Sequence, residues 1–254
     1  MSVYWQLPLL FATGLMAGFV DSIAGGGGLI TLPVLLNLGL GPQEALGTNK
    51  LQATFGSGSA ATHYAAAKAV SLKDCGRGFV CTLFGAALGA VAVQQVDPSF
   101  LSRSIPVLLI LVAGYLLLKP QLGSKDLHPR MRRIWFDLVF GLFLGFYDGF
   151  FGPGTGTFWA MAYMLGLGFN MMRATGYTKV MNFASNLSSL VLFLLGGKVR
   201  FEMGLTMGLG QLVGARIGSR MVIARGTKFI RPIFLVVVLA LTLKLLYEAY
   251  LPRN

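Results

Sequence analysis

Long apolar runs without a charged side chain dominate this chain. They extend from Ser22 to Gln43, from Gly78 to Val96 and from Val180 to Gly197, and cover 22, 19 and 18 residues. About 18 apolar residues or more are enough for a helix to cross the hydrocarbon core of a membrane. A membrane β-barrel would instead alternate apolar and polar residues over segments of about ten. The continuous runs, rich in Leu, Ala and Gly, therefore predict an all-α polytopic membrane protein.

The apolar runs belong to eight blocks, at about residues 4–38, 43–67, 77–96, 101–118, 134–168, 172–197, 203–223 and 230–249. The polar stretch from Lys119 to Arg133, KPQLGSKDLHPRMRR, divides the blocks four and four. We therefore predict a first transmembrane repeat over 1–119, a basic cytoplasmic linker over 120–133 and a second transmembrane repeat over 134–254.

The two halves share a sequence repeat. A shift of 127 residues places Gly14–Gly41 over Gly141–Gly168, with 11 of 28 positions identical. Composition alone would give about two or three identities. A further shift of two residues places ALGTNK, which ends at Lys50, over ATGYTK, which ends at Lys179. This pattern indicates an internal duplication.

The first block of each half is too long for one crossing. At 1.5 Å per residue, 35 residues would form a helix of about 52 Å, against a hydrocarbon core of about 30 Å. The sequences AGGGG (24–28) and GPGTG (152–156) interrupt these blocks, and glycine runs and proline break helices. Each half is therefore predicted to contain one glycine-broken helical hairpin plus three transmembrane helices. Since three is odd, the halves would form an inverted-repeat bundle.

Glycine is abundant, at 34 residues, and recurs at four-residue spacing as Gly14/Gly18, Gly85/Gly89 and Gly210/Gly214/Gly218. Small residues at this spacing let membrane helices approach closely. We expect most of these glycines to serve helix packing.

The charge distribution predicts an orientation. The chain is 55% hydrophobic and 12% charged, with a formal net charge of +12. In the hairpin topology one face holds 13 basic residues and the other four. Basic loops are retained on the cytoplasmic side, so both termini are predicted outside. Because retention on the cytoplasmic side explains the basic residues, we expect no nucleic-acid partner. The lipid bilayer is the expected partner.

The glycine breaks are the first candidate site. A half-helix is expected to begin after each break, at about Leu29 and Thr157, with its unpaired amides and positive dipole end at the tip. Such an end binds anions, although a tight turn that needs glycine for steric reasons is the alternative. The candidate substrate-binding residues are Gly25, Gly26, Gly27, Gly28, Gly152, Gly154, Thr155 and Gly156.

Two lysines are further candidates. Lys50 and Lys179 are each expected to open a helix and are followed by at least 17 uncharged residues. A charge at membrane depth is costly and often functional, so each lysine is either a partner for a substrate anion or a side chain that extends to the lipid headgroups. Asn49 and Asn182 are polar neighbours that could donate hydrogen bonds.

Two carboxylates precede the breaks. Asp21 and Asp148 each lie four residues before the first glycine of their loop. They are either structural partners of the lysines or proton carriers, that is, coupling carboxylates. Arg216 is expected either to line the pathway or to mark the cytoplasmic end of its helix, and His63 is expected to be a packing residue.

The motifs GFVDSIAGGGGLITLPVLL and ALGTNKLQ, with GFYDGFFGPGTGTF and ATGYTK in the second half, resemble the TauE/SafE sulfite exporter family. The likeness covers nearly the whole chain. It implies a secondary transporter, an exporter of sulfur-containing anions such as sulfite or organosulfonates, in the bacterial cytoplasmic (inner) membrane. Pro153 and Thr155 replace glycines of the first half, and Tyr177-Thr178 replaces Thr48-Asn49.

The function predicted from these features is transport of a small anionic substrate near the membrane midplane. Transport of another small anion or of a divalent metal cation is the alternative, although two acids without a His or Cys cluster make a poor transition-metal site. No HExxH, GxSxG or GxxxxGK[ST] motif is present, so we expect neither an enzyme nor a cofactor. The sequence leaves the oligomeric state open.

Overall fold

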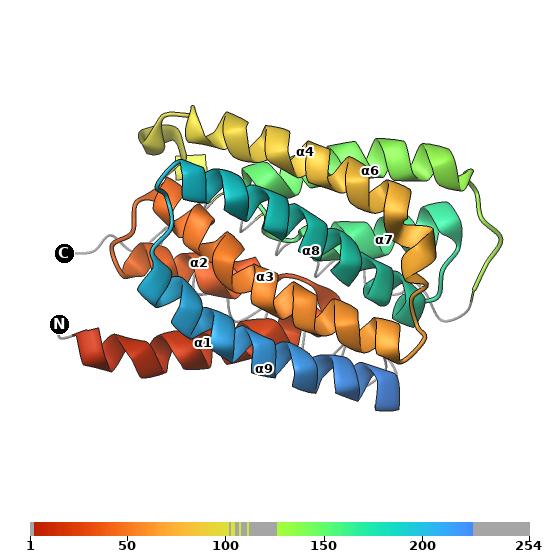
Figure 1. Ribbon diagram of the computed structural model, residues 1–254, viewed down its shortest axis with the longest axis horizontal. Coiled ribbons are helices and arrows are strands. Elements are labelled where there is room, and N and C mark those ends of the chain that lie inside the picture. Colours follow the sequence, from red (N-terminus) through yellow and green to blue (C-terminus); the bar gives the residue numbers. More distant parts are fainter. Residues whose placement is uncertain (1–2, 102, 105–106, 108–110, 112–125, 226–254) are drawn as a thin grey trace.

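The computed structural model describes residues 3–101, 103–104, 107, 111 and 126–225, and within them the regular elements are helices (Figure 1). In chain order these are α1 (Val3–Ala24), α2 (Gly27–Asn37), α3 (Pro42–Ala66), the short 3₁₀ helix η1 (Leu72–Cys75), α4 (Gly76–Gln94), α6 (Arg133–Phe150), α7 (Thr155–Leu167), α8 (Met171–Leu195) and α9 (Phe201–Arg225). The prediction of an all-helical protein is confirmed for this part of the chain.

Several of these helices suit a membrane. The segments Gln6–Ala24, Leu72–Gln94 and Met171–Leu195 are long and apolar enough to cross one. Helices α3 and α9 coincide with the predicted blocks 43–67 and 203–223. The predicted block 230–249 and most of 101–118 lie outside the described residues.

The bundle exposes large apolar side chains and buries charged ones. Large apolar side chains face outward, with Phe143 69% and Leu195 80% exposed. The interior contains charged groups, since Lys50 and Lys179 are 1% and 0% exposed. A soluble protein would bury the large apolar side chains and expose the charged ones. The arrangement is that of a bundle surrounded by lipid around a polar centre.

The two glycine breaks adopt the same kind of backbone conformation. Helix α1 ends at Ala24, Gly25 and Gly26 adopt φ values of 80° and 97°, and α2 begins at Gly27. In the second half Gly152 and Gly154 adopt φ values of 95° and 79° before α7 begins at Thr155. Positive φ is accessible to glycine without steric cost, which explains why these residues end the helices. The half-helices thus begin two residues earlier than predicted.

The broken helices reach the centre from opposite ends of the bundle. Helix α1 runs inward from the end near the N-terminus, and α6 runs inward from the other end (Figure 1). Helices α3 and α8 lie side by side between α4 and α9, and α1 and α6 pack on the outer two. This arrangement brings both breaks to the middle of the molecule.

Glycines hold the outer helix pairs together. A Cβ on Gly14 or Gly18 of α1 would lie 2.1 or 2.4 Å from a backbone oxygen of α9, at Met207 and Gln211. In the second half, a Cβ on Gly149 of α6 would lie 2.1 Å from the backbone oxygen of Ala86 in α4. These backbones touch because the side chains are absent, as the four-residue spacing predicted.

One end of the bundle is rich in basic residues. It is the end where α3, α7 and α9 finish, and it carries Lys68, Lys73, Arg77, Arg130, Arg132, Arg133, Arg173, Arg220 and Arg225. There Arg133 Nη2 donates to the backbone oxygen of Asp74, 2.9 Å away, and so joins the start of α6 to η1. The opposite end, where α8 finishes and α9 begins, carries Lys198 and Arg200.

We expect Gly14→Ala to destabilise the protein, because its new methyl group would overlap the backbone of α9. Overpacking of this kind costs about 1–3 kcal/mol, which corresponds to a melting temperature about 2–12 °C lower. Gly41→Ala is the matched control, since a Cβ there meets nothing within 4 Å. Thermal unfolding of the purified proteins in detergent tests this packing, and equal melting temperatures for the two variants would contradict it.

Candidate functional site

The two glycine breaks touch each other at the centre of the bundle. A Cβ on Gly25 would lie 2.7 Å from the backbone carbon of Gly156, so only glycine fits between the loops. The Thr157 hydroxyl donates a hydrogen bond of 2.9 Å to the backbone oxygen of Ala24. The starts of α2 and α7 therefore face a common space, although they are 128 residues apart in the sequence.

Two ion pairs cross between the halves of the chain. Lys50 Nζ lies 2.7 Å from Asp148 Oδ1, and Lys179 Nζ lies 2.9 Å from Asp21 Oδ2. The lysine side chains are 1% and 0% exposed, and the Asp148 and Asp21 side chains 5% and 19%. Each lysine of one half is thus paired with the carboxylate that precedes the glycine break of the other half.

The expectation that the lysines open their helices was wrong. Helix α3 begins at Pro42 and α8 at Met171, so Lys50 and Lys179 are each the ninth residue of a 25-residue helix. Their position explains why neither extends to the surface. The segments ALGTNK and ATGYTK are helical throughout. In α3, the proline at the first helical position starts the helix before the ALGTNK motif.

Additional hydrogen bonds orient the two carboxylates. Asp21 Oδ1 accepts from the Gly27 amide, the first N–H of α2, at 3.2 Å. Asp148 Oδ2 accepts from the Ser185 hydroxyl, and Lys50 also donates to the backbone oxygen of Asp148. A buried charge is tolerated when it is paired and its remaining lone pairs are satisfied, as here.

The two asparagines differ in their environment. Asn49 Oδ1 accepts from the Thr31 hydroxyl at 2.5 Å and from Gln52 Nε2 at 2.7 Å. Asn182 is 6% exposed, and its Oδ1 has no hydrogen-bond partner within the described part of the chain. Asn182 is therefore the one of these two asparagines whose buried side-chain oxygen has no donor among the described residues.

A small polar cavity lies between these groups, with a volume of about 30 Å³. That space accommodates about two water molecules. Its lining includes the predicted residues Asp21, Gly26, Gly27, Gly28, Asn49, Asp148, Gly152, Gly154, Thr155, Gly156 and Asn182. Gly25, Lys50 and Lys179 are not part of the lining: Gly25 closes against Gly156, and the lysines are paired with the carboxylates that line the cavity.

Sequence reasoning missed three residues of this lining, namely Ala53, Asn186 and Gln211. Gln211 is 2% exposed, and its Oε1 has no hydrogen-bond partner among the described residues. It stands beside Gly210 in a glycine-rich helix, and an uncharged polar residue in such a helix was the available signal. Arg216 does not line this cavity: it is exposed and lines a separate surface pocket with Phe55 and Leu212.

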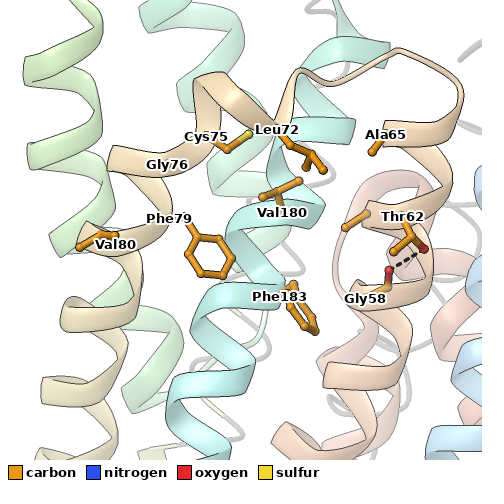
Figure 2. Close-up of a pocket in the computed structure, with 11 residues that line it drawn as sticks. Gly58, Thr62, Ala65, Leu72, Cys75, Gly76, Phe79, Val80, Val180 and Phe183 are labelled. Atoms are coloured by element: carbon orange, nitrogen blue, oxygen red, sulfur yellow. Dashed lines mark hydrogen bonds between the residues drawn. The ribbon is translucent and has the colours of Figure 1, made fainter.

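A larger pocket of about 430 Å³ lies between α3, η1, α4 and α8 (Figure 2). Phe79, Val180 and Phe183 contribute to a wall without a charged side chain. Because transfer of an unpaired charge to such surroundings is strongly unfavourable, this pocket does not suit an anion. His63 lies elsewhere, half-buried, with Nδ1 2.7 Å from the Ser219 hydroxyl of α9.

The family model described as "Sulfite exporter TauE/SafE" matches residues 10–245. The chain belongs to the sulfite exporter TauE/SafE family. It is 46% identical over 244 residues to the probable membrane transporter protein YfcA of Escherichia coli (strain K12), covering 96% of this chain and 91% of that protein. A probable membrane transporter protein of Haemophilus influenzae is 43% identical over 242 residues, covering 95% of both chains. No solved structure gives a significant match.

Membership of the TauE/SafE family confirms the resemblance and establishes a multi-pass membrane transporter rather than an enzyme. The family name refers to sulfite, whereas the names of these relatives give no substrate. Transport implies a small-molecule substrate and a lipid environment. The central polar cavity is the candidate place for that substrate.

We expect Lys50→Met to destabilise the protein strongly, because it leaves the Asp148 carboxylate buried without its cation. Removal of one partner from a buried pair costs about 3–5 kcal/mol, or about 6–20 °C in melting temperature. The double variant Lys50→Met/Asp148→Asn should regain at least about half of this loss, since no uncompensated charge remains.

Arg200→Met is the matched control, because Arg200 pairs with Glu44 at 3.0 Å while 61% exposed. Exposed pairs contribute about 0–1 kcal/mol. Thermal unfolding in detergent provides the comparison. A Lys50→Met variant as stable as Arg200→Met would show that the buried pair does not hold the halves together.

Proposed function

We propose that this TauE/SafE protein is a secondary transporter that exports small sulfur-containing anions, such as sulfite or organosulfonates. The substrate binds in the central cavity between the two glycine breaks. The observation that carries the proposal is the convergence of two half-helix N-termini and two crossed lysine–aspartate pairs on one enclosed space. The family description supports the substrate class.

The helix starts suit an anion. The first amides of a helix lack intrahelical partners and carry partial positive charge. Gly27 and Gly28 of α2 and Thr155 and Gly156 of α7 all line the cavity, and neither helix has an acidic residue in its first turn. The Gly27 amide already donates to Asp21 and the Thr155 amide to the Gly152 oxygen, so the Gly28 and Gly156 amides are the donors left for an anion. A tetrahedral or pyramidal oxyanion can accept hydrogen bonds from both tips at once.

The size of the cavity supports alternating access. A space of about 30 Å³ encloses water-sized groups but leaves little room for a larger anion. The broken helices enter from opposite ends and seal the centre where Gly25 meets Gly156. In the proposed inverted-repeat mechanism, one half moves against the other, and the centre opens first to one side and then to the other.

The proposed orientation follows the basic residues. The end that carries Arg130, Arg132, Arg133 and Arg173 faces the cytoplasm of a bacterial inner membrane, because basic loops are retained there. Helix α1 begins at the opposite end, so the start of α1 lies on the outer side in this orientation (Figure 1). The matching prediction for the C-terminus concerns residues outside the described part of the chain.

We expect Gly28→Ala to weaken substrate binding without loss of stability. Its Cβ would lie 3.6 Å from Pro153 Cα, an ordinary contact, so the variant folds while a methyl group enters the cavity wall. An unfavourable contact of about 1.4 kcal/mol or more lowers the affinity at least about tenfold. Uptake of ³⁵S-sulfite into proteoliposomes measures this change, with competition by small sulfonates, other oxyanions and divalent metals.

Gly41→Ala is the control, since Gly41 lies outside the cavity and its Cβ meets nothing within 4 Å. Inhibition of uptake by sulfonates identifies the substrate class. Binding of divalent metals with no response to sulfite or sulfonates would instead establish the cation alternative. Equal apparent affinity of Gly28→Ala and the unmodified protein for sulfite would place the binding site elsewhere.

A further inference from the structure

Asp21 already occupies hydrogen-bond donors that a bound anion would need. Its Oδ2 accepts a hydrogen bond from Lys179 Nζ at 2.9 Å, and its Oδ1 accepts one from the amide of Gly27 at 3.2 Å. That amide is the first N–H of α2, at the tip that faces the cavity. The carboxylate thus stands where a substrate oxyanion would be held.

Charge balance makes simple addition of an anion unfavourable. Lys50 and Lys179 contribute two positive charges, and Asp21 and Asp148 contribute two negative charges, so the four groups sum to zero. A monoanion added to this buried set would leave one uncompensated negative charge. Uncompensated buried charge is costly, and a group in that position takes up a proton instead.

The two carboxylates are not equally free to change. The Asp148 side chain is 5% exposed and holds both Lys50 and the Ser185 hydroxyl. The Asp21 side chain is 19% exposed and holds Lys179 together with a backbone amide at the cavity. Asp21 is therefore the carboxylate that is more accessible to a proton. When Asp21 lets go of its partners, the Gly27 amide at the glycine break becomes free to donate.

The surroundings of Asp21 can accommodate a neutral carboxyl group. Among the described residues, the charged or titratable groups that face it are Lys179 of α8 and the Tyr64 hydroxyl of α3, which donates to Ser22. Helices α2 and α9 present groups that do not titrate, at Gly27 and Gln211. On α7, the Thr157 hydroxyl contacts the end of α1 at Ala24 and does not titrate either. The Gln211 side chain lies in the same cavity, with Nε2 as the end nearest Gly27 and Oε1 directed toward Gly56 of α3.

We propose that Asp21 is a resident anion of the binding site, displaced by the substrate when it takes up a proton. The proton binds a carboxylate oxygen of Asp21, and the substrate anion takes over Lys179 Nζ and the Gly27 amide. Release on the other side reverses both exchanges. Each monoanion therefore crosses with one proton, and no net charge moves. This inference rests on the proposed function and adds its coupling ion. Because the anion and the proton cross together, net export follows the combined outward gradient of substrate and protons.

The test uses the full-length protein in proteoliposomes and radiolabelled methanesulfonate, which stays a monoanion over the whole working pH range, whereas sulfite would titrate. A dye inside the vesicles follows the internal pH. We expect about one proton to enter with each anion, and an inward proton gradient of one pH unit to drive about tenfold accumulation. Membrane voltage should have no effect, because the transported pair is neutral.

Asp21→Asn mimics the neutral carboxyl group. We expect this variant to exchange internal for external methanesulfonate but to lose accumulation driven by the pH gradient. Saturating methanesulfonate should raise its melting temperature more than that of the unmodified protein, because the anion supplies the charge that Lys179 lacks. Asp126→Asn is the matched control, since Asp126 is 49% exposed and remote from the cavity, and its transport should be unchanged.

The outcomes separate the two proposals. Transport of methanesulfonate without proton entry, or driven by a sodium gradient instead, overturns the role of Asp21 and leaves the proposed function intact. Accumulation by Asp21→Asn that still follows the pH gradient also overturns it. Absence of both sulfite and methanesulfonate transport by the unmodified protein overturns the proposed function and this inference with it. If Asp21→Asn does not fold, the proton measurement on the unmodified protein decides.

Discussion

The crossed lysine–aspartate pairs are the interaction on which the rest of the structure depends. Lys50 and Lys179 lie in the middle of long helices, and in a low-dielectric interior each needs a carboxylate close by. The carboxylates come from Asp148 and Asp21, each one helical turn before the glycine break of the opposite half. Pairing the charges therefore forces the two breaks together, and the polar cavity forms between them.

Glycine packing makes that central arrangement geometrically possible. Lipid surrounds the bundle, so apolar contact between helices gains little over contact with lipid, and close backbone approach has to supply the association. Gly14 and Gly18 bring α1 against α9, and Gly149 brings α6 against α4. Because α1 and α6 are each in backbone contact with their partner helix, their C-terminal ends lie at the centre of the bundle. Glycines that break a helix there are not exposed to lipid.

Much of this could be read from the sequence, and the limits have a physical cause. Positive φ makes glycine runs informative, so the breaks at 24–28 and 152–156 were located to within two residues. The depth of the lysines within their helices was harder to predict, because the TNK and YTK motifs do not reveal that each helix starts eight residues before its lysine. Which carboxylate pairs with each lysine, and that Gln211 lines the cavity, depend on how segments far apart in the sequence pack together. The residue type at a single position carries no information on that packing.

The halves resemble each other in backbone but not in side chains, and this difference bears on mechanism. Gly28 corresponds to Thr155, Asn49 to Thr178 and Asn182 to Ala53 in the repeat. Ser185, which holds Asp148, corresponds to Gly56, so Asp21 has no such hydroxyl. Asp21 is instead held by the Gly27 amide at the cavity. A duplicated ion pair can in this way divide two tasks: the Asp148 pair keeps its bonds and joins the halves, which leaves the Asp21 pair free to exchange its carboxylate for a substrate anion.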